Sequence, residues 1–330
     1  MESTESLVRD FTYNPLPKGL VLAKPLQREA YKEEVIYQLE KDGKLIKTRK
    51  RDGWKLFFVK FGGVWKIYTD GMNEVDGRLD HIKKELNSLR LPDKTVLVGE
   101  GIVDLDGNDS RPKVISIFQS NLARSLELQN HLGRIKAMFF EVMFYDGRYL
   151  LSDRYASRLA ILKRSLGRKK LNYLMLETVL DMSYDDAKKL VRKLGWEGLV
   201  LYDSEFTSSF KLGGQSPSRP KGCYKWKPIF EDDFVVRGWL PHRKDPNKFK
   251  EVMLLQINPV SKQEFDCGKF GSFNKAVRER LLAIRYPIVM QVQFEGRYES
   301  GKLINPVFVE IRTDKKPEDC IAPKSFSVLR

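Results

Sequence analysis

The sequence predicts an α+β chain of two domains, a mixed α/β domain over residues 1–230 and a β-barrel domain over residues 231–330. In the first part, apolar strand-like runs alternate with helical patterns, and from Glu231 the pattern becomes almost entirely strand-like. A β-rich module of this size suggests a five-stranded barrel of the OB type. The 330 residues are enough for two domains with separate cores.

Short patterns predict the elements in order. The spacing of Leu79, Ile82, Leu86 and Leu89 indicates a helix, Gly62-Gly63 indicates a turn between strands, and Gly195 indicates a helix end. In the first domain we expect helices over 29–39, 80–89, 155–166, 171–178 and 184–194, and strands over 45–46, 54–59, 64–68, 95–103, 114–118, 137–144, 198–202 and 224–227. In the second we expect strands over 234–240, 251–257, 288–294 and 307–311, and a helix near 274–283.

Charge points to a polyanionic partner. Lys and Arg number 59 against 44 Asp and Glu, a net charge of +15, which favours nucleic acid or an acidic membrane surface. The sequence shows no long apolar run and no signal peptide, so nothing in it favours the membrane. The cysteines Cys223, Cys267 and Cys320 are few and far apart, which fits a reducing compartment such as the cytoplasm. The three scattered histidines form no zinc pattern.

A short polar segment, Lys50-Arg51-Asp52-Gly53-Trp54-Lys55, separates two strand-like runs and carries a candidate nucleophile. An amine attacks phosphorus only as the free base, and the ordinary lysine pKa is ~10.4. Burial and neighbouring cations lower a lysine pKa, and Arg49, Arg51 and Lys55 surround Lys50. A charged hairpin turn is the alternative interpretation of this segment.

Four further segments downstream supply matching residue types. Glu100 stands between glycines in an apolar strand, where a carboxylate can hold a ribose hydroxyl or a metal ion, although a simple β-bulge is equally compatible. Phe140 lies in an aromatic run, and such residues are more often core than cofactor contacts. Glu197 precedes another apolar strand. Alternation places Lys225 and Lys227 on one face of a strand, as a phosphate clamp or a solvated edge.

The joint order of these segments resembles the covalent nucleotidyltransferase superfamily of DNA ligases, RNA ligases and mRNA capping enzymes. Lys50 to Lys55 matches the family's nucleophile motif, Lys-x-Asp-Gly-x-Arg/Lys, and the later segments match its later motifs. The stretch 308–319, with its Arg-x-Asp-Lys core followed by Lys-Pro-Glu, looks more like a DNA ligase than a capping enzyme. The resemblance covers roughly residues 28–320 and implies an ATP-grasp-like nucleotidyltransferase domain followed by an OB-fold domain.

The resemblance implies an ATP-dependent DNA ligase of a minimal viral or phage-like form, acting as a monomer on nicked duplex DNA in the cytoplasm, or the host cytoplasm if viral. It implies ATP as the AMP donor and Mg²⁺ or Mn²⁺ as the metal. Catalytic residues would be Lys50 as nucleophile, Lys225, Lys227 and Arg312. Nucleotide contacts would come from Thr48, Arg49, Lys55, Glu100, Phe140, Lys225, Lys227, Arg312 and Lys315, and metal contacts from Glu197 and Glu100.

Three positions depart from the family pattern. Thr48 stands where DNA ligases often carry a glutamate that reads adenine, and Asp70 lies where Ser-Arg often follows the strand after the first motif. Glu141 stands where aspartate is common. An RNA ligase or a GTP-using capping enzyme on the same scaffold remains the alternative function. A nucleic-acid-binding protein that has lost catalysis is the alternative from another class.

Overall fold

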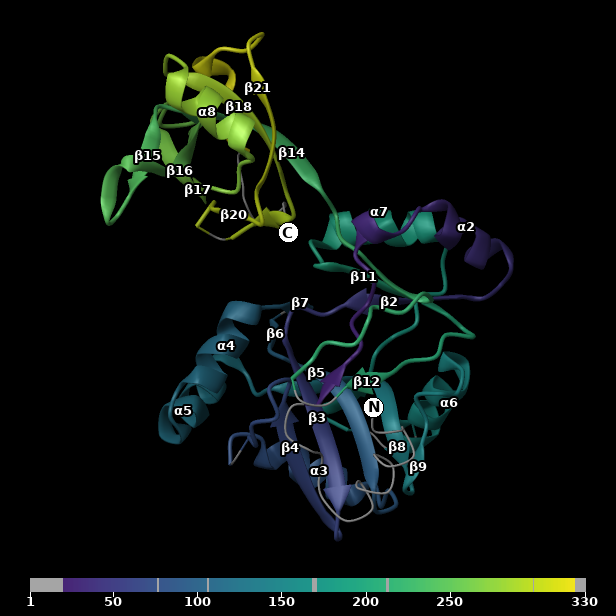
Figure 1. Cartoon of the computed structure of the whole chain (residues 1–330). Helices are drawn as coiled ribbons and strands as arrows, with labels where there is room; N and C mark the ends of the chain where they lie inside the picture. The colour runs from purple at the N-terminus through teal and green to yellow at the C-terminus, as the bar shows by residue number, and fades with distance from the viewer. Residues whose placement is uncertain are drawn as a thin grey trace. The chain divides into compact units, whose positions relative to one another are not determined.

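We describe the chain from a computed structural model, which defines residues 20–75, 77–105, 107–167, 171–211, 214–298 and 300–323. The chain divides into two compact units. The first comprises Met1–Lys188 and Trp196–Trp226, and the second comprises Lys189–Gly195 and Lys227–Arg330. The first unit is mixed α/β and the second is β-rich (Figure 1), so the expected α+β fold class is confirmed.

The first unit is built on a six-stranded sheet. Its strand order is β10-β8-β5-β3-β4, with β9 attached to β8. The strands are β3 Trp54–Phe61, β4 Val64–Thr69, β5 Thr95–Ile102, β8 Lys136–Tyr145, β9 Arg148–Tyr149 and β10 Leu174–Leu176. Only the β8–β10 pairing is parallel among these neighbours.

Both faces of this sheet are apolar, which explains the continuous hydrophobic run in β3. Because successive side chains point to opposite faces, Leu56 and Phe58 enter one core cluster and Phe57 and Val59 enter another. The first cluster is completed by helices α3 Asp80–Ser88, α4 Arg111–Gln119, α5 Leu122–Leu132 and α6 Tyr155–Leu166.

A three-stranded antiparallel sheet, β13-β11-β2, completes the first unit. It consists of β2 Leu45–Lys50, β11 Gly198–Asp203 and β13 Cys223–Trp226. Two helices, α2 Glu34–Lys41 and α7 Tyr184–Leu194, contact each other through Tyr37 and Tyr184. The remaining short elements are η1 Arg28–Ala30, the pair β1 Val21–Leu22 and β12 Phe210–Lys211, and the hairpin β6 Asp104–Leu105 and β7 Asn108–Asp109.

The second unit is an OB-type β domain with a six-stranded sheet in the order β15-β16-β14-β18-β21 and β17 beside β16. Arg297 is fully buried in this unit, where Phe234 and Phe294 cover its guanidinium. Its elements are β14 Phe230–Val236, β15 Trp239–His242, β16 Asp245–Ile257, β17 Glu264–Phe270, α8 Lys275–Ala283, β18 Ile288–Phe294, β19 Gly296–Arg297, β20 Leu303–Ile304, β21 Val307–Arg312 and η2 Pro317–Asp319.

Two predicted elements are wrong. The strand expected over 114–118 is part of helix α4, which begins with a proline in its first turn and buries Val114 and Ile117 three residues apart. The helix expected over 171–178 is instead strand β10, which satisfies its backbone beside β8. Helix α5 and strand β17 were not predicted. Short apolar runs do not distinguish helix from strand, and tertiary pairing decides.

Candidate active site

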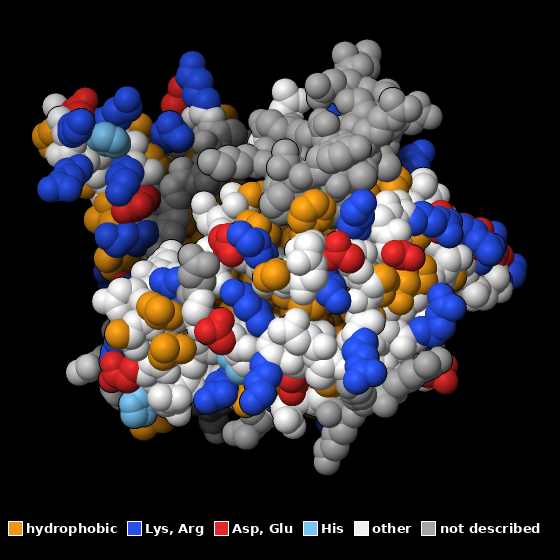
Figure 2. All heavy atoms as spheres, turned by 90° about the horizontal axis from the view of Figure 1, so that it is seen from below, with side chains coloured by type: hydrophobic (Ala, Val, Ile, Leu, Met, Phe, Trp, Pro, Cys, Tyr) orange, Lys and Arg blue, Asp and Glu red, His pale blue; other side chains and the backbone are white. Residues whose placement is uncertain are grey.

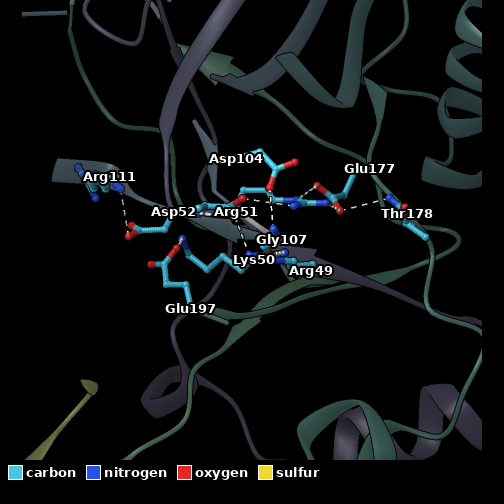
Figure 3. Close-up of polar contacts among 11 residues, drawn as sticks. Arg49, Lys50, Arg51, Asp52, Asp104, Gly107, Arg111, Glu177, Thr178 and Glu197 are labelled. Atoms are coloured by element: carbon cyan, nitrogen blue, oxygen red, sulfur yellow. Dashed lines mark hydrogen bonds and ion pairs between the residues drawn. The ribbon is translucent and has the colours of Figure 1, made fainter. Parts of the chain in front are cut away.

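Lys50 meets Glu197 where strand β2 ends beside the start of strand β11. Lys50 is the last residue of β2 rather than a loop residue, and it lies opposite Gly198 of β11. Its Nζ is 2.5 Å from Oε2 of Glu197, the residue just before β11 (Figure 3). The two side chains are 25% and 18% exposed, so both remain reachable by a ligand. Strand pairing therefore joins the predicted nucleophile to a predicted metal ligand.

Lys55 and Glu100 lie opposite each other in the neighbouring pair β3–β5. Gly53 allows this approach, because a Cβ there would lie 2.8 Å from Cγ of Glu100 and 2.4 Å from the carbonyl oxygen of Gly101. The Nζ of Lys55 is 2.6 Å from Oδ1 of Asp70. Asp70 thus engages Lys55 at the position where the family pattern often has Ser-Arg.

Two carboxyl groups in this region, Glu100 and Asp52, have raised pKa values. Burial raises the pKa of Glu100 to about 8, and the nearby Glu197 carboxylate adds to the rise while Lys50 and Lys55 oppose it. Burial also raises the pKa of Asp52, again with a contribution from Glu197. Asp52 accepts a hydrogen bond from the backbone N–H of Arg111 at 3.4 Å, at the start of α4. The site therefore concentrates acidic groups that a cation would stabilise.

Phe140 occupies a β-bulge. Val98 of β5 pairs with Glu141 and Gly99 pairs with Phe139, so Phe140 is the extra residue on β8. Bulges redirect side chains and are common beside active sites. Phe140 packs partly buried against the cluster that contains Phe57, on the sheet face that Lys55 shares with Phe57 by alternation. The structure thus places the predicted adenine-stacking residue on the same sheet face as Lys55.

Arg49 and Arg51 are paired with carboxylates. Arg49 binds Asp109 at 3.0 Å and lies 4.6 Å above the ring of Trp196. Arg51 binds Glu177 at 2.8 Å and Asp109 at 3.3 Å. The cationic surroundings expected for Lys50 are therefore largely offset by acidic partners, which the sequence did not reveal.

Thr48 is buried within its sheet. Its hydroxyl donates to the carbonyl of Val200 at 3.3 Å. Lys225 of β13 is also paired with Val200, so Thr48, Val200 and Lys225 form one row across the three strands. The backbone of Lys225 is held by Leu26 and by the hydroxyl of Tyr31.

Lys227, Arg312 and Lys315 belong to the second unit, where each pairs with a carboxylate of that unit. Lys227 Nζ lies 2.5 Å from Oε2 of Glu295, and Lys315 binds Asp233. The guanidinium of Arg312 donates to both oxygens of Asp314, at 2.8 and 2.6 Å, and also approaches Asp233 at 3.5 Å.

Two carboxylates could hold a divalent metal. Within the described ranges, no cluster of three or more His, Cys, Asp or Glu side chains is arranged as a metal site. Mg²⁺ usually takes one or two protein carboxylates and completes its shell with water and substrate phosphates. Glu197 and Glu100 fit that donor set, since their mutual repulsion contributes to the raised pKa of Glu100.

The sequence did not single out Asp109, Glu177 or Trp196. Glu177 ends an apolar Leu-Met-Leu run, and a lone acid after such a run is the one signal that could have indicated it. Asp109 stands in a polar loop and carries no comparable signal. Its importance follows only from the β6–β7 hairpin that brings it to Arg49 and Arg51.

Comparison with known proteins covers most of the chain. The model of the family described as "ATP dependent DNA ligase domain" matches residues 21–227. The DNA ligase of Thermococcus fumicolans is 25% identical over 321 residues, covering 88% of this chain and 56% of the relative. DNA ligase 1 of Methanosarcina mazei is 23% identical, covering 90% and 60%. The chain thus spans 56–60% of the length of these relatives.

Solved structures agree on the fold. A structure described as a Lig E DNA ligase, under a title on DNA binding with a minimal scaffold, superimposes with a TM-score of 0.61 at 16% identity. The superposition covers 90% of this chain and 100% of the Lig E chain, so both units have counterparts there. The family match spans the segments that hold Lys50, Glu100, Phe140, Glu197, Lys225 and Lys227.

Proposed function

Because this chain belongs to the ATP-dependent DNA ligase domain family, we propose that it seals nicks in duplex DNA. It would join a 5′-phosphate to a 3′-hydroxyl through a covalent lysyl-AMP and a DNA-adenylate. The observation that carries the proposal is the position of Lys50, 2.5 Å from Glu197 at the end of β2. A partly exposed amine beside a carboxylate, with Lys55 and Glu100 on adjoining strands, suits nucleotidyl transfer.

The proposed chemistry has three steps. The amine of Lys50 attacks the α-phosphorus of ATP, a P–N bond forms, and the bond to pyrophosphate breaks as the amine loses a proton. The 5′-phosphate of the nick then attacks the same phosphorus and displaces Lys50. Finally the 3′-hydroxyl attacks the 5′-phosphate and AMP leaves. Such transfers depend on positioning and charge neutralisation.

The residues around Lys50 would divide the binding of ATP. Lys55 and Glu100 would hold the ribose or a phosphate, and Phe140 would stack on adenine. Lys225 and Lys227 would contact the α-phosphate, and Arg312 and Lys315 would orient pyrophosphate. Glu197, with Glu100, would hold Mg²⁺ or Mn²⁺, which neutralises phosphate charge when bound. The internal contacts of Thr48 and Arg49 favour a role in supporting β2 over direct nucleotide contact.

Residues 1–230 would act as the adenylyltransferase domain and residues 231–330 as the OB domain, in a monomer working in the cytoplasm. Among the described residues, no helix is long and apolar enough to cross a membrane. The net charge of +15 supports a DNA partner, and Figure 2 shows Lys and Arg side chains spread over one face among fewer acidic ones.

Covalent labelling tests the proposal. Purified protein is incubated with Mg²⁺ and α-labelled ATP or GTP, run on a denaturing gel, and the labelled peptide is mapped. Label from ATP on Lys50, lost in Lys50→Ala and kept in the exposed control Lys44→Ala, supports a ligase. A comparison of the sealing rates of nicked DNA and nicked RNA then decides which of the two is the substrate. Label from GTP alone, or none in folded, unadenylylated protein, overturns the proposal.

A further inference from the structure

Arg49 and Arg51 are the sequence neighbours of Lys50. Their side chains point to the opposite side of the chain from the Lys50 side chain. Successive residues of an extended chain point to opposite faces. In Figure 3 the Lys50 side chain runs toward Glu197, whereas Arg51 runs the opposite way toward Glu177. Whatever holds the two arginines therefore also fixes the direction of Lys50.

One buried carboxylate holds both arginines. Asp109 Oδ2 lies 3.0 Å from Nη2 of Arg49, and its Oδ1 lies 3.3 Å from Nη1 of Arg51. The Asp109 side chain is 2% exposed, so solvent hardly screens these contacts. Its Oδ2 also accepts the backbone N–H of Asp52 at 3.4 Å. Asp109 thus contacts residues on both sides of Lys50.

A second carboxylate fixes the orientation of Arg51. Arg51 donates hydrogen bonds to Glu177 from Nε at 2.8 Å and from Nη2 at 3.2 Å, a two-bond contact that sets the plane of the guanidinium. The Glu177 side chain is 5% exposed, and its backbone N–H donates to the carbonyl of Phe139 in β8. The contact therefore ties the nucleophile segment to the central sheet.

Arg49 has a comparable set of partners. Its Nη1 donates to the carbonyl of Gly107 at 2.8 Å, in the hairpin that carries Asp109. Its guanidinium also lies 4.6 Å from the ring of Trp196, a distance typical of cation–π contact. Trp196 directly precedes Glu197, the partner of Lys50.

We propose that Asp109 and Glu177 are positioning residues that direct the amine of Lys50 at the α-phosphorus of ATP by holding Arg49 and Arg51. We call these four residues the arginine clamp. The inference rests on the proposed function, because it concerns the first step of that reaction. Removing one partner leaves a buried charge uncompensated, so the segment has to move. A displacement of about 1 Å at a reacting group can slow a reaction ~10²-fold.

Isosteric variants test the clamp. Asp109→Asn and Glu177→Gln keep the shape of the side chain and remove its charge. Asp93→Asn is the matched control, because it makes the same change at a carboxylate that accepts hydrogen bonds from the Gly62-Gly63 turn. We expect the maximal rate of single-turnover Lys50 adenylylation to fall at least ~10-fold in the first two variants. The ATP concentration for half-maximal rate should change less than about threefold, as expected when positioning rather than binding is lost.

Sealing of a pre-adenylylated nick separates positioning from general damage. That step does not use the Lys50 amine as a nucleophile, so both variants should retain most of it while the control retains every step. Arg51→Lys, which keeps one charge but not the two-bond contact, should lie between wild type and Glu177→Gln. Combining Glu177→Gln with Arg51→Lys should cost less than the sum of the single effects.

Two outcomes would overturn the clamp. One is a parallel loss of adenylylation and of pre-adenylylated nick sealing, which indicates general structural damage. The other is an unchanged adenylylation rate in folded Asp109→Asn and Glu177→Gln. Failure of the proposed function is distinguishable, because the wild-type protein itself would then take no label from ATP.

Discussion

Lys50 and Glu197 form an ion pair of 2.5 Å at the point where β2 ends beside the start of β11. Glu197 therefore has two possible partners, the amine of Lys50 and the metal ion that we propose for this site. Binding of the metal ion by Glu197 would open its contact with Lys50, so that the amine could face the α-phosphorus of ATP.

The first prediction concerns Glu197. We expect Glu197→Gln to lower the rate of Lys50 adenylylation ~10²-fold, because the proposed metal ion loses a carboxylate ligand and the Lys50 side chain loses a contact that orients it. The half-saturating Mg²⁺ concentration should also rise, as measured by label transfer across a Mg²⁺ titration. Glu40→Gln is the matched control, since Glu40 pairs with Lys47 of the same strand at 2.9 Å. Wild-type rates at every Mg²⁺ concentration would contradict a role for Glu197.

Three of the candidate site residues were predicted because they stand in short motifs. Lys50 stands in a Lys-x-Asp-Gly motif, Glu100 between the glycines of an apolar strand and Glu197 before another apolar strand. Each is ambiguous alone, and only their joint order indicates a site. Asp109 and Glu177 lie 58 and 126 positions from Arg51, and their contacts depend on a hairpin and on the β8–β10 register. No local pattern encodes such pairings.

The same limit applies to the fold. The long apolar and helical patterns gave β3, α6 and α8 close to their observed bounds. The run that became α4 is rich in β-branched residues and was mistaken for a strand, although Val114 and Ile117 are buried at helical spacing. The packing of this run against the sheet decides between helix and strand.

A second prediction uses Gly53. Gly53→Ala should disturb the site, because the added Cβ would meet the carbonyl oxygen of Gly101 at 2.4 Å and Cγ2 of Ile102 at 2.9 Å. Backbone atoms have to move, so we expect a stability loss of about 1–3 kcal/mol by urea unfolding. Adenylylation should fall ~10²-fold because Lys50 is displaced.

Gly238→Ala is the control for that experiment, since nothing lies within 4 Å of its added Cβ. It should leave stability and adenylylation near wild type. If Gly53→Ala labels as fast as Gly238→Ala, the close packing of the nucleophile segment on β5 has no bearing on catalysis.

A third prediction concerns the buried pair of Glu141 and Arg158. Arg158 is fully buried and donates to both Glu141 oxygens, at 2.7 and 3.0 Å. Arg158→Met leaves the carboxylate unpaired, so we expect a loss of about 3–5 kcal/mol in urea unfolding of the first unit. Arg148→Met, which breaks an exposed pair with Asp153, should cost within about 0.5 kcal/mol. Equal losses in the two variants would contradict the assignment.

The last prediction concerns the pH dependence of Glu100. Burial raises its pKa from 4.5 to about 8, so the folded protein keeps a proton there that the unfolded chain releases above pH 4.5. The stabilising contribution of protonated Glu100 is therefore complete below about pH 4.5 and is lost as the pH rises through about 8.

Glu100→Gln mimics the protonated form at every pH. The variant should match the wild type in Tm near pH 5 and exceed it near pH 8.5 by at least about 2 °C, measured by thermal unfolding without nucleotide or metal. Glu310→Gln, which changes an exposed carboxyl of the second unit, should show no such dependence. A Tm difference for Glu100→Gln that is constant from pH 5 to about 8.5 would place the Glu100 pKa in the ordinary range. Its carboxylate would then be ionised in the free protein and ready to bind a metal at neutral pH.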